Sequence, residues 1–462
     1  MTEKIKQTLR DSKGARWAVL TLVAFTMATG YFFTDVLSPL EELLIRTLKW
    51  DGDQYGFFAG QYSFLNIIGF IVLGGIILDK LGIRFTGVFF VSLMVVGGVV
   101  KAYGVSEYFN NGGFGYEFFS SFLPKYEPSV KVATIGFAIF GLGVEIAGVT
   151  VSRIIVKWFK GKEMALAMGL EMAVARLGMG AAFLLAPKIA QDVSAYKPVI
   201  FGVLLMVIGL LTFLIHCMMD VKLDKEVEDE NNSEEDEAFK LSDIGKLFTN
   251  HGFVFIAILC VLFYSCVFPF MKFAANLMSN KYGVDAETAG FIAFILPFGT
   301  ILLTPLFGSF IDNKGKGATM MILGSVLLII VHSIFAFLPG NIVLAYTGMF
   351  ILGVGFSLVP SAMWPSVPKI VSENRLGTAY SLIFWIQNLG LWAFPMLIGS
   401  VREWSNPGVT AQKQQGIDVA YDYTNPMLML VSVGIVALIF AFLLKYYDKK
   451  KAYGLELPNI QK

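Results

Sequence analysis

Charged residues are scarce in this sequence. Asp, Glu, Lys and Arg make up 15% of its 462 residues, whereas a soluble domain carries about 25%. Hydrophobic residues reach 56% and the mean hydropathy is +0.66. These values exclude an ordinary soluble fold and predict an integral protein of the lipid bilayer. Because the net charge is only +1, the sequence also lacks the basic excess expected of a nucleic-acid-binding protein.

Cysteine and histidine are also rare, with three residues of each. Cys217, Cys260 and Cys266 all lie in apolar runs without paired spacing, so we predict neither a disulfide framework nor a metal site. The sequence has no HExxH, GxSxG, GxGD or Walker motif, which argues against an enzyme and against ATP-driven activity. We expect no cofactor. The polar N-terminal stretch is too long for a cleaved signal peptide.

Twelve apolar runs are long enough to cross a membrane as helices. Lys and Arg cluster in the loops on one side, so the positive-inside rule places both termini in the cytoplasm. The acidic stretch KEVEDENNSEEDEAFK lies between the first six runs and the last six, and it is expected to be a solvated linker. The predicted all-α membrane protein has a tail (1–16), a six-helix bundle (17–219), the linker (220–251), a second bundle (252–447) and a tail (448–462). The runs cover 17–37, 55–78, 85–104, 131–155, 164–187, 197–219, 252–279, 286–311, 318–338, 341–365, 376–400 and 425–447.

One motif recurs in the two halves. A glycine, an aspartate four residues later and then a basic turn occur at Gly75–Arg84 and again at Gly308–Lys316, with an offset of 233. A second match relates Gly161–Gly178 to Leu376–Gly390 with an offset of 212. Such parallel repeats predict two bundles related by an axis along the membrane normal, which is the major facilitator arrangement. The motif is expected to form a cytoplasmic gate that holds one bundle against the other, with Asp79, Lys80, Arg84, Asp312 and Lys314 as its residues.

Two opposite charges interrupt the apolar runs on either side of a basic loop. Glu145 and Arg176 each lie fifteen residues from the loop midpoint at Lys160–Gly161, or roughly 22 Å along a helix. Both therefore fall near the middle of the roughly 30 Å hydrocarbon core, where an ionisable residue is a functional candidate. A guanidinium binds a carboxylate and a carboxylate binds an ammonium, so the two residues suit a zwitterionic ligand. A structural ion pair is the alternative interpretation.

Other polar and aromatic residues in the runs are candidates for the same site, although packing or an interfacial position is an alternative for each. Asp35 ends the first run and Lys272 lies late in the seventh, so both could lie at the outer mouth of a cavity. Glu171 is expected to point about 140° away from Arg176; it is either structural or, if it lines the cavity, a proton carrier. The further candidates for substrate contact are Tyr62, Asn66, Trp364, Trp385, Gln387 and Asn388.

Three stretches resemble one family. They are WFKGKEMALAMGLEMAVARLG at 158–178, YSCVFPF at 264–270, and MWPSVP with NRLGTAYSLIFWIQNLG within 363–390. They are similar to the major facilitator superfamily domain-containing protein 1 family, known in animals as lysosomal dipeptide transporters. The resemblance implies that Glu145 and Arg176 hold the amino and carboxyl ends of a dipeptide and that transport is uniport. The family usually has glutamine at the place of Glu171, which leaves proton coupling open.

The tails and loops set the expected location. The N-terminal tail is short and lacks the dileucine signal of the animal members, and the one N-x-S/T sequon, Asn231–Ser233, falls in the linker. A bacterial inner membrane is therefore favoured, with the lysosomal membrane expected if the source is eukaryotic.

The sequence thus predicts a transporter of small peptides or related zwitterions that works by alternating access. A proton-coupled symporter of organic or inorganic anions, with Arg176 as the anion site, is one alternative. A membrane receptor or scaffold that does not transport is another, although two copies of a gating motif argue against it. The sequence identifies no accessory subunit.

Overall fold

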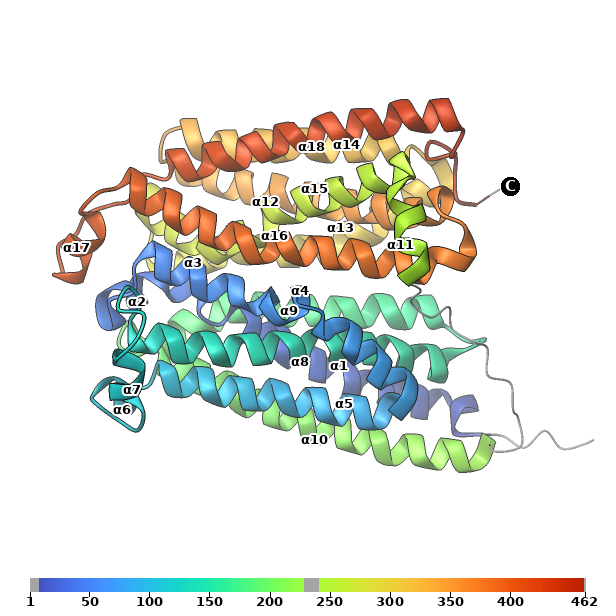
Figure 1. Ribbon diagram of the computed structural model, residues 1–462, viewed down its shortest axis with the longest axis horizontal. Helices are drawn as coiled ribbons and strands as arrows, with labels where there is room; N and C mark the ends of the chain where they lie inside the picture. The colour runs from blue at the N-terminus through green and yellow to red at the C-terminus, as the bar shows by residue number, and fades with distance from the viewer. Residues whose placement is uncertain (1–7, 228–240, 461–462) are drawn as a thin grey trace, which may run out of the picture.

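Two bundles of long apolar helices lie side by side in this protein (Figure 1). The structure is a computed structural model that describes residues 8–227 and 241–460. Every regular element in those ranges is a helix, and eleven of these helices are long and apolar enough to cross a membrane. The all-α prediction is confirmed.

The two bundles repeat one packing pattern. In the first bundle α1 packs on α9 and α10, while α5 packs on α8 and α10. In the second bundle α12 packs on α16 and α18, while α14 packs on α15 and α18. The order of the helices along the chain makes these contacts equivalent, which agrees with the repeat found in the sequence. The long helices are α1 (Lys13–Asp35), α5 (Phe70–Gly104), α8 (Pro128–Phe159), α9 (Met164–Ala190), α10 (Tyr196–Val227), α12 (His251–Tyr282), α13 (Ala286–Lys314), α14 (Gly317–Phe337), α15 (Ile342–Ile370), α16 (Leu376–Ser405) and α18 (Thr424–Lys451).

Helix α5 contains two legs joined by a kink. Its 35 residues would extend roughly 52 Å if straight, which exceeds the roughly 30 Å core of a bilayer. Gly82 adopts a φ of 74° inside the helix, a conformation that glycine reaches without a steric penalty. The run predicted over 55–78 ends before this glycine, and the run predicted over 85–104 begins after it. The eleven long helices therefore agree with twelve predicted passes.

The pass before Gly82 is broken, and the prediction of an uninterrupted helix over 55–78 is wrong. The chain forms α3 (Gly52–Gly60), η3 (Gln61–Ser63), α4 (Phe64–Ile67) and then the first leg of α5. Gly69 separates α4 from α5 with a φ of 102°. Hydropathy does not reveal this break, because the residues on both sides of it stay apolar and glycine is common in continuous membrane helices.

The two bundles touch closely where α3 meets α16. Gly52, Gly56 and Gly60 recur every four residues on α3, and a Cβ on each would lie within 3 Å of an atom of α16. A Cβ on Gly399 of α16 would lie 1.9 Å from the carbonyl oxygen of Gly52. Small residues at this spacing let helix backbones approach each other in a membrane.

Replacing Gly399 should therefore weaken the contact between the bundles. We expect Gly399→Ala to lower the melting temperature of the purified protein, because the added methyl group meets backbone and not a flexible side chain. Gly75→Ala is the matched control, since nothing lies within 4 Å of a Cβ at that position. Equal melting curves for both variants would show that the α3–α16 contact does not depend on this glycine.

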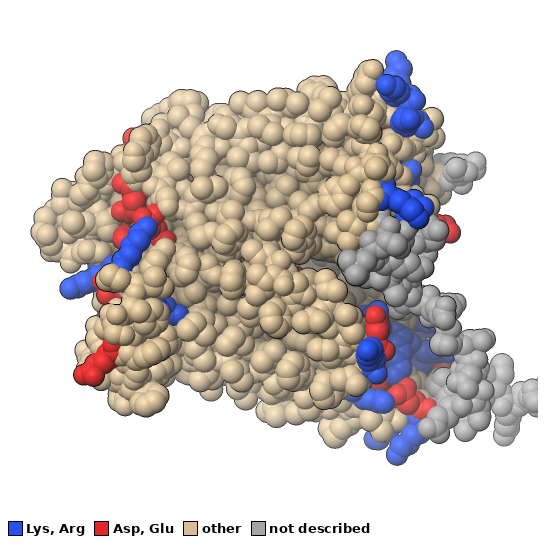
Figure 2. Space-filling view, in the orientation of Figure 1, with Lys and Arg blue, Asp and Glu red and all other residues tan. Residues whose placement is uncertain are grey.

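Charged side chains lie at the two ends of the molecule, with a broad uncharged band between them (Figure 2). Both ends of the described chain lie at one of these ends (Figure 1), which we call the terminal end. The opposite, distal end holds α2 (Glu41–Leu48), α6 (Glu107–Asn110), α7 (Tyr116–Ser120) and α17 (Val409–Gln414). The uncharged band is the part of the surface suited to lipid.

The predicted linker over 220–251 is partly helical. Helix α10 extends to Val227, and the short helix α11 covers Leu241–Phe248. The middle of the linker, with the sequon at 231–233, lies outside the described residues.

The C-terminal tail folds back over the terminal end of the second bundle. The backbone carbonyl of Leu455 accepts a hydrogen bond from the N–H of Gly317, the first residue of α14, and that of Glu456 accepts from the N–H of Lys316, which precedes the helix. The Glu456 carboxylate accepts from the backbone N–H of Thr319 at 2.8 Å. Leu455 is 1% exposed. The tail thus acts as a strap across the turn that joins α13 to α14.

Candidate functional site

A cavity of about 280 Å³ lies between the two bundles, halfway along the long helices. Both bundles contribute to its wall. Glu145 and Arg176, which the sequence places at equal depth, both line it, as do Tyr62, Asp35, Lys272, Trp364 and Gln387. The wall is completed by Tyr31, Thr34, Ala59, Met172, Met179, Tyr264, Phe268, Pro269, Phe356, Phe384, Leu391 and Pro395.

The acidic part of the wall comes from α8 and from the break in the preceding pass. The Tyr62 hydroxyl, in η3, donates to Glu145 Oε1 at 2.6 Å. Gly141 lies one turn before Glu145, and a Cβ there would lie 2.0 Å from the carbonyl oxygen of Tyr62. The glycine therefore allows η3 to approach α8 closely, and this approach brings the phenol to the carboxylate.

The basic part of the wall comes from α9. The Arg176 guanidinium carbon lies 5.1 Å from the ring centre of Phe356, which belongs to the other bundle. Within residues 8–227 and 241–460 the guanidinium has no hydrogen bond or ion pair, and Glu145 is hydrogen-bonded to Tyr62 instead. Arg176 and Glu145 thus do not form the ion pair that was one interpretation of their spacing. The guanidinium keeps its donors free for a ligand.

A second pair of charges in the cavity joins the bundles. Lys272 Nζ lies 2.7 Å from Asp35 Oδ1 and donates to the carbonyl oxygen of Thr34 at 2.9 Å. Asp35 is the last residue of α1 and Lys272 lies on α12. The side chains are 6% and 12% exposed, respectively. This pair forms part of the distal wall of the cavity and holds α1 against α12.

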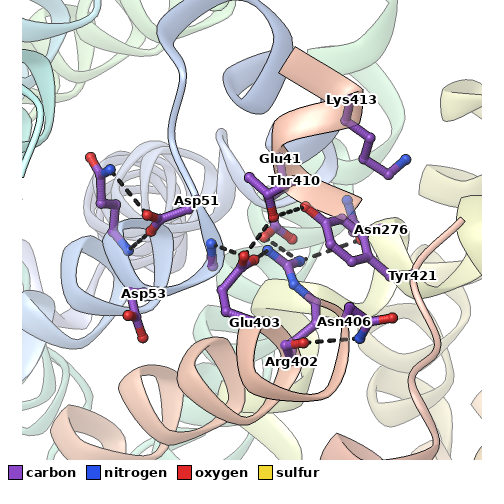
Figure 3. A network of polar contacts seen from close by, with 12 residues as sticks. Glu41, Asp51, Asp53, Asn276, Arg402, Glu403, Asn406, Thr410, Lys413 and Tyr421 are labelled. Carbon is purple, nitrogen blue, oxygen red and sulfur yellow. Dashed lines mark hydrogen bonds and ion pairs between the residues drawn. The ribbon is translucent and has the colours of Figure 1, made fainter. Parts of the chain in front are cut away.

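The distal end is sealed by a buried polar network between the bundles (Figure 3). Arg402 of α16 donates to Glu41 Oε1 at 2.6 Å, and Glu41 and Arg402 are both at most 1% exposed. Glu403 accepts from the Gly52 backbone N–H at 2.8 Å and pairs with Arg402 at 3.3 Å. At the edge of the network Asp51 caps α3, and partial burial raises the pKa of its carboxyl.

Ion pairs between described residues of the two bundles concentrate at this end. Besides the Asp35 and Arg402 pairs, Lys413 lies 2.7 Å from Glu42, and Lys188 lies 3.8 Å from Glu287. The cavity is therefore closed from the distal side by contacts that would have to separate if that end opened.

Four of the predicted residues lie outside the cavity wall. Asn66 is fully buried, and its amide has no hydrogen-bond partner in the described part of the chain. Trp385 Nε1 donates to the carbonyl oxygen of Ile67, and Asn388 donates to the carbonyl oxygen of Phe384. Glu171 directly precedes the lining residue Met172 but does not line the cavity itself. Their predicted roles stay predictions.

The predicted gating residues contact their own bundle in this conformation. Asp79 lies 2.7 Å from Arg153, and Arg84 lies 2.7 Å from Asp224. Asp312 accepts from Asn459 of the tail at 2.8 Å. Lys80 and Lys314 are exposed. Among residues 8–227 and 241–460, each of these aspartates bonds within its own half and neither forms a latch to the other bundle.

Much of the aromatic wall was not predicted from the sequence. Tyr31 lies one turn before Asp35 on α1, a spacing that places both on one face of a helix. Tyr264 accepts a hydrogen bond from Trp364 Nε1 at 3.2 Å, and Phe356 faces Arg176. Phenylalanine is so abundant in this chain, with 42 residues, that no pattern distinguishes a cavity aromatic from a packing one.

Two helical bundles that enclose a charged cavity at mid-depth define a multi-pass membrane transporter. The pattern of the Major Facilitator Superfamily matches residues 23–395, and the chain belongs to that superfamily. It is 30% identical to the lysosomal dipeptide transporter MFSD1 of Mus musculus over 399 residues, which cover 84% of this chain and 80% of that protein. It is 28% identical to the MFSD1 of Danio rerio over 398 residues, covering 84% and 81%.

Solved structures agree with the fold. A bacterial homologue of the human lysosomal transporter Spinster, in an inward-facing and unoccupied conformation, superposes with a TM-score of 0.71 at 16% identity, covering 95% of this chain and 98% of that one. The nucleoside transporter NupG gives a TM-score of 0.69 at 16% identity, covering 93% and 99%. At these identities the comparison supports the fold alone.

Proposed function

We propose that this transporter carries dipeptides, or zwitterions of similar size, by alternating access. The observation that carries the proposal is that Glu145 and Arg176 line one cavity without bonding to each other. A carboxylate is thus available for a ligand ammonium, and a guanidinium with free donors is available for a ligand carboxylate. The cavity volume of about 280 Å³ lies near the lower limit of ligand pockets, roughly 300 Å³, which suits a small peptide. The MFSD1 relatives are named as lysosomal dipeptide transporters, which supports the same substrate class.

In the proposed complex, the two ends of the peptide lie against the first bundle. The ammonium binds Glu145 beside the Tyr62 hydroxyl, and the carboxylate binds Arg176. The side chains of the peptide then face the aromatic wall of the second bundle, where Trp364 and Gln387 supply polar contacts. With the termini in the cytoplasm, the sealed distal end makes this conformation inward-facing.

The same proposal gives roles to the two bundles, the gating residues and Glu171. The two bundles, over 17–219 and 252–447, act as the moving units, and the chain moves its substrate without chemical conversion. Asp79, Lys80, Arg84, Asp312 and Lys314 act in gating once the terminal end closes. Uniport is the mode of transport, with Glu171 as the carboxylate to be tested for proton coupling. The proposed location is a bacterial inner membrane, or the lysosomal membrane in a eukaryote.

The proposal is tested by uptake of radiolabelled glycyl-leucine into proteoliposomes. We expect saturable uptake that other dipeptides inhibit and that N-acetylated or amidated dipeptides do not, because each blocked peptide lacks one of the two charges. Inhibition by monocarboxylates together with a requirement for a pH gradient would replace the proposal by anion symport.

Glu145→Gln should lower the apparent affinity for glycyl-leucine about tenfold. A neutral amide still accepts a hydrogen bond, but loses the charge assistance, which is worth on the order of 1.4 kcal/mol. Glycine methyl ester, which carries the ammonium alone, serves as a probe of the same contact through its inhibition constant. The variant Gln387→Glu, which moves a carboxylate to the other bundle, is the control and should not restore affinity in the Glu145→Gln background.

A further inference from the structure

Two lysines from different bundles bind the C-terminal end of α1. Lys272 of α12 donates to the carbonyl oxygen of Thr34 and pairs with Asp35. Lys101 of α5 donates to the carbonyl oxygen of the preceding residue, Phe33, at 3.2 Å. The two ammonium groups share one aromatic ring, since Lys101 Nζ lies 4.3 Å and Lys272 Nζ lies 5.7 Å from the ring centre of Phe137.

Lys101 is a buried lysine without a carboxylate bound to it in the described part of the chain. Its side chain is 0% exposed, and its ammonium group lies 4.4 Å from the ring centre of Phe33 and 5.3 Å from that of Phe58. Three aromatic faces and one carbonyl stabilise an ammonium group less fully than a carboxylate does in the same surroundings. Lys272, a residue of the same charge type, lies at the same Phe137 ring, and Asp35, a residue of opposite charge, comes two positions after Phe33.

From this arrangement we infer that Lys101 is the second partner of Asp35 in the transport cycle. Lys272 belongs to the second bundle, so it moves away from Asp35 when the distal end opens. Lys101 and Asp35 belong to the same bundle and stay together. The departure of Lys272 also removes the repulsion that keeps Lys101 at the Phe33 carbonyl. Lys101 then binds the Asp35 carboxylate, and the open conformation has no uncompensated charge at the end of α1.

The inferred exchange makes Lys101 a positioning residue for the opening step. Without it, opening would break the Lys272–Asp35 pair and leave the Asp35 carboxylate with no cation, which is unfavourable for a pair that starts out buried. The inference rests on the alternating access that we propose, but it does not depend on which substrate is carried.

The test therefore measures opening of the distal end without substrate. Tyr55 of α3 donates to the carbonyl oxygen of Lys272 across the two bundles, and its side chain is 1% exposed, so a cysteine at this position is accessible only while that end is open. Tyr55→Cys is introduced into the full-length protein after Cys217, Cys260 and Cys266 are replaced by alanine. The rate at which a membrane-impermeant maleimide labels the cysteine reports the open fraction.

We expect Lys101→Met to lower the labelling rate at least fivefold and Lys101→Arg to restore it. In an Asp35→Asn background, Lys101→Met should have no further effect, because no carboxylate remains for it to bind. A merely structural role of Lys101 predicts the same change in both backgrounds, and that result would overturn the inference.

Lys272→Met provides a second measurement that leaves Lys101 in place. Loss of the closed-state partner should raise the labelling rate at least fivefold, because Asp35 then binds Lys101 and the open conformation is favoured. An unchanged or lower rate would contradict the inference, even if Lys101→Met were too unstable to purify. Because no peptide is present, failure of this experiment is separate from failure of dipeptide uptake.

Discussion

Arg176→Ala is expected to reduce glycyl-leucine uptake more than 100-fold while leaving the melting temperature of the protein unchanged. A bidentate guanidinium–carboxylate contact contains two charge-assisted hydrogen bonds, which together contribute roughly 3 kcal/mol or more. The fold should be unaffected, because Arg176 has no hydrogen-bond or ion-pair partner between residues 8 and 227 or 241 and 460 that its removal would leave unpaired.

Two controls separate recognition of the carboxylate from general damage. Arg176→Lys keeps the charge but not the planar fork, so we expect an intermediate loss of about tenfold. Glycyl-leucinamide has no carboxylate, and its weak transport should be the same in the wild type and in Arg176→Ala. If the alanine variant took up glycyl-leucine at the normal rate, Arg176 would not bind substrate and the proposed orientation of the peptide would be wrong.

Arg402→Ala is expected to shift the distal end from closed to open by more than 100-fold. The substitution leaves Glu41 buried without its cation, and breaking a buried ion pair in this way costs about 3–5 kcal/mol. Glu41 is on the first bundle and Arg402 on the second. Separation of the bundles would hydrate the stranded carboxylate, so the loss should appear as opening rather than as unfolding.

Maleimide labelling of the cysteine at position 55 measures this shift. Lys188→Ala is the matched control, because Lys188 and its partner Glu287 in the other bundle are both 60% exposed and a pair at the surface contributes at most about 1 kcal/mol. Adding Glu41→Gln to Arg402→Ala should restore much of the closed state, since a neutral amide is less costly to bury than a carboxylate. A closed fraction that stays high in Arg402→Ala alone would show that the glycine contacts of α3 and α16 seal this end by themselves.

The bundles and the two central charges could be predicted from the sequence because they depend on regular spacing. The length of each apolar run predicts a membrane pass, and equal distances from one loop place Glu145 and Arg176 at equal depth. The partners of those residues could not be predicted in the same way. Tyr62 reaches Glu145 only because the helix is interrupted at η3. The positive φ of Gly69, which belongs to the same interrupted pass, cannot be predicted from composition.

The polar network at the distal end could not be predicted from the sequence either. Glu41 and Arg402 are separated by 361 positions, and both lie where a helix end is expected to be hydrated. Their burial depends on how the two bundles meet. Lys101 was missed for a related reason, since a lysine near the end of a run normally extends to the membrane surface.

The strap formed by the C-terminal tail has a consequence for synthesis of the protein. The turn between α13 and α14 leaves the ribosome well before the residues that secure it, because Leu455 and Glu456 follow α18 in the sequence. The first bundle can be completed during translation, as is usual for N-terminal units. The second bundle has to wait for the residues that follow α18, so a product that stopped at Ala452 would insert in the membrane with all its long helices and would still lack the contacts that secure this turn.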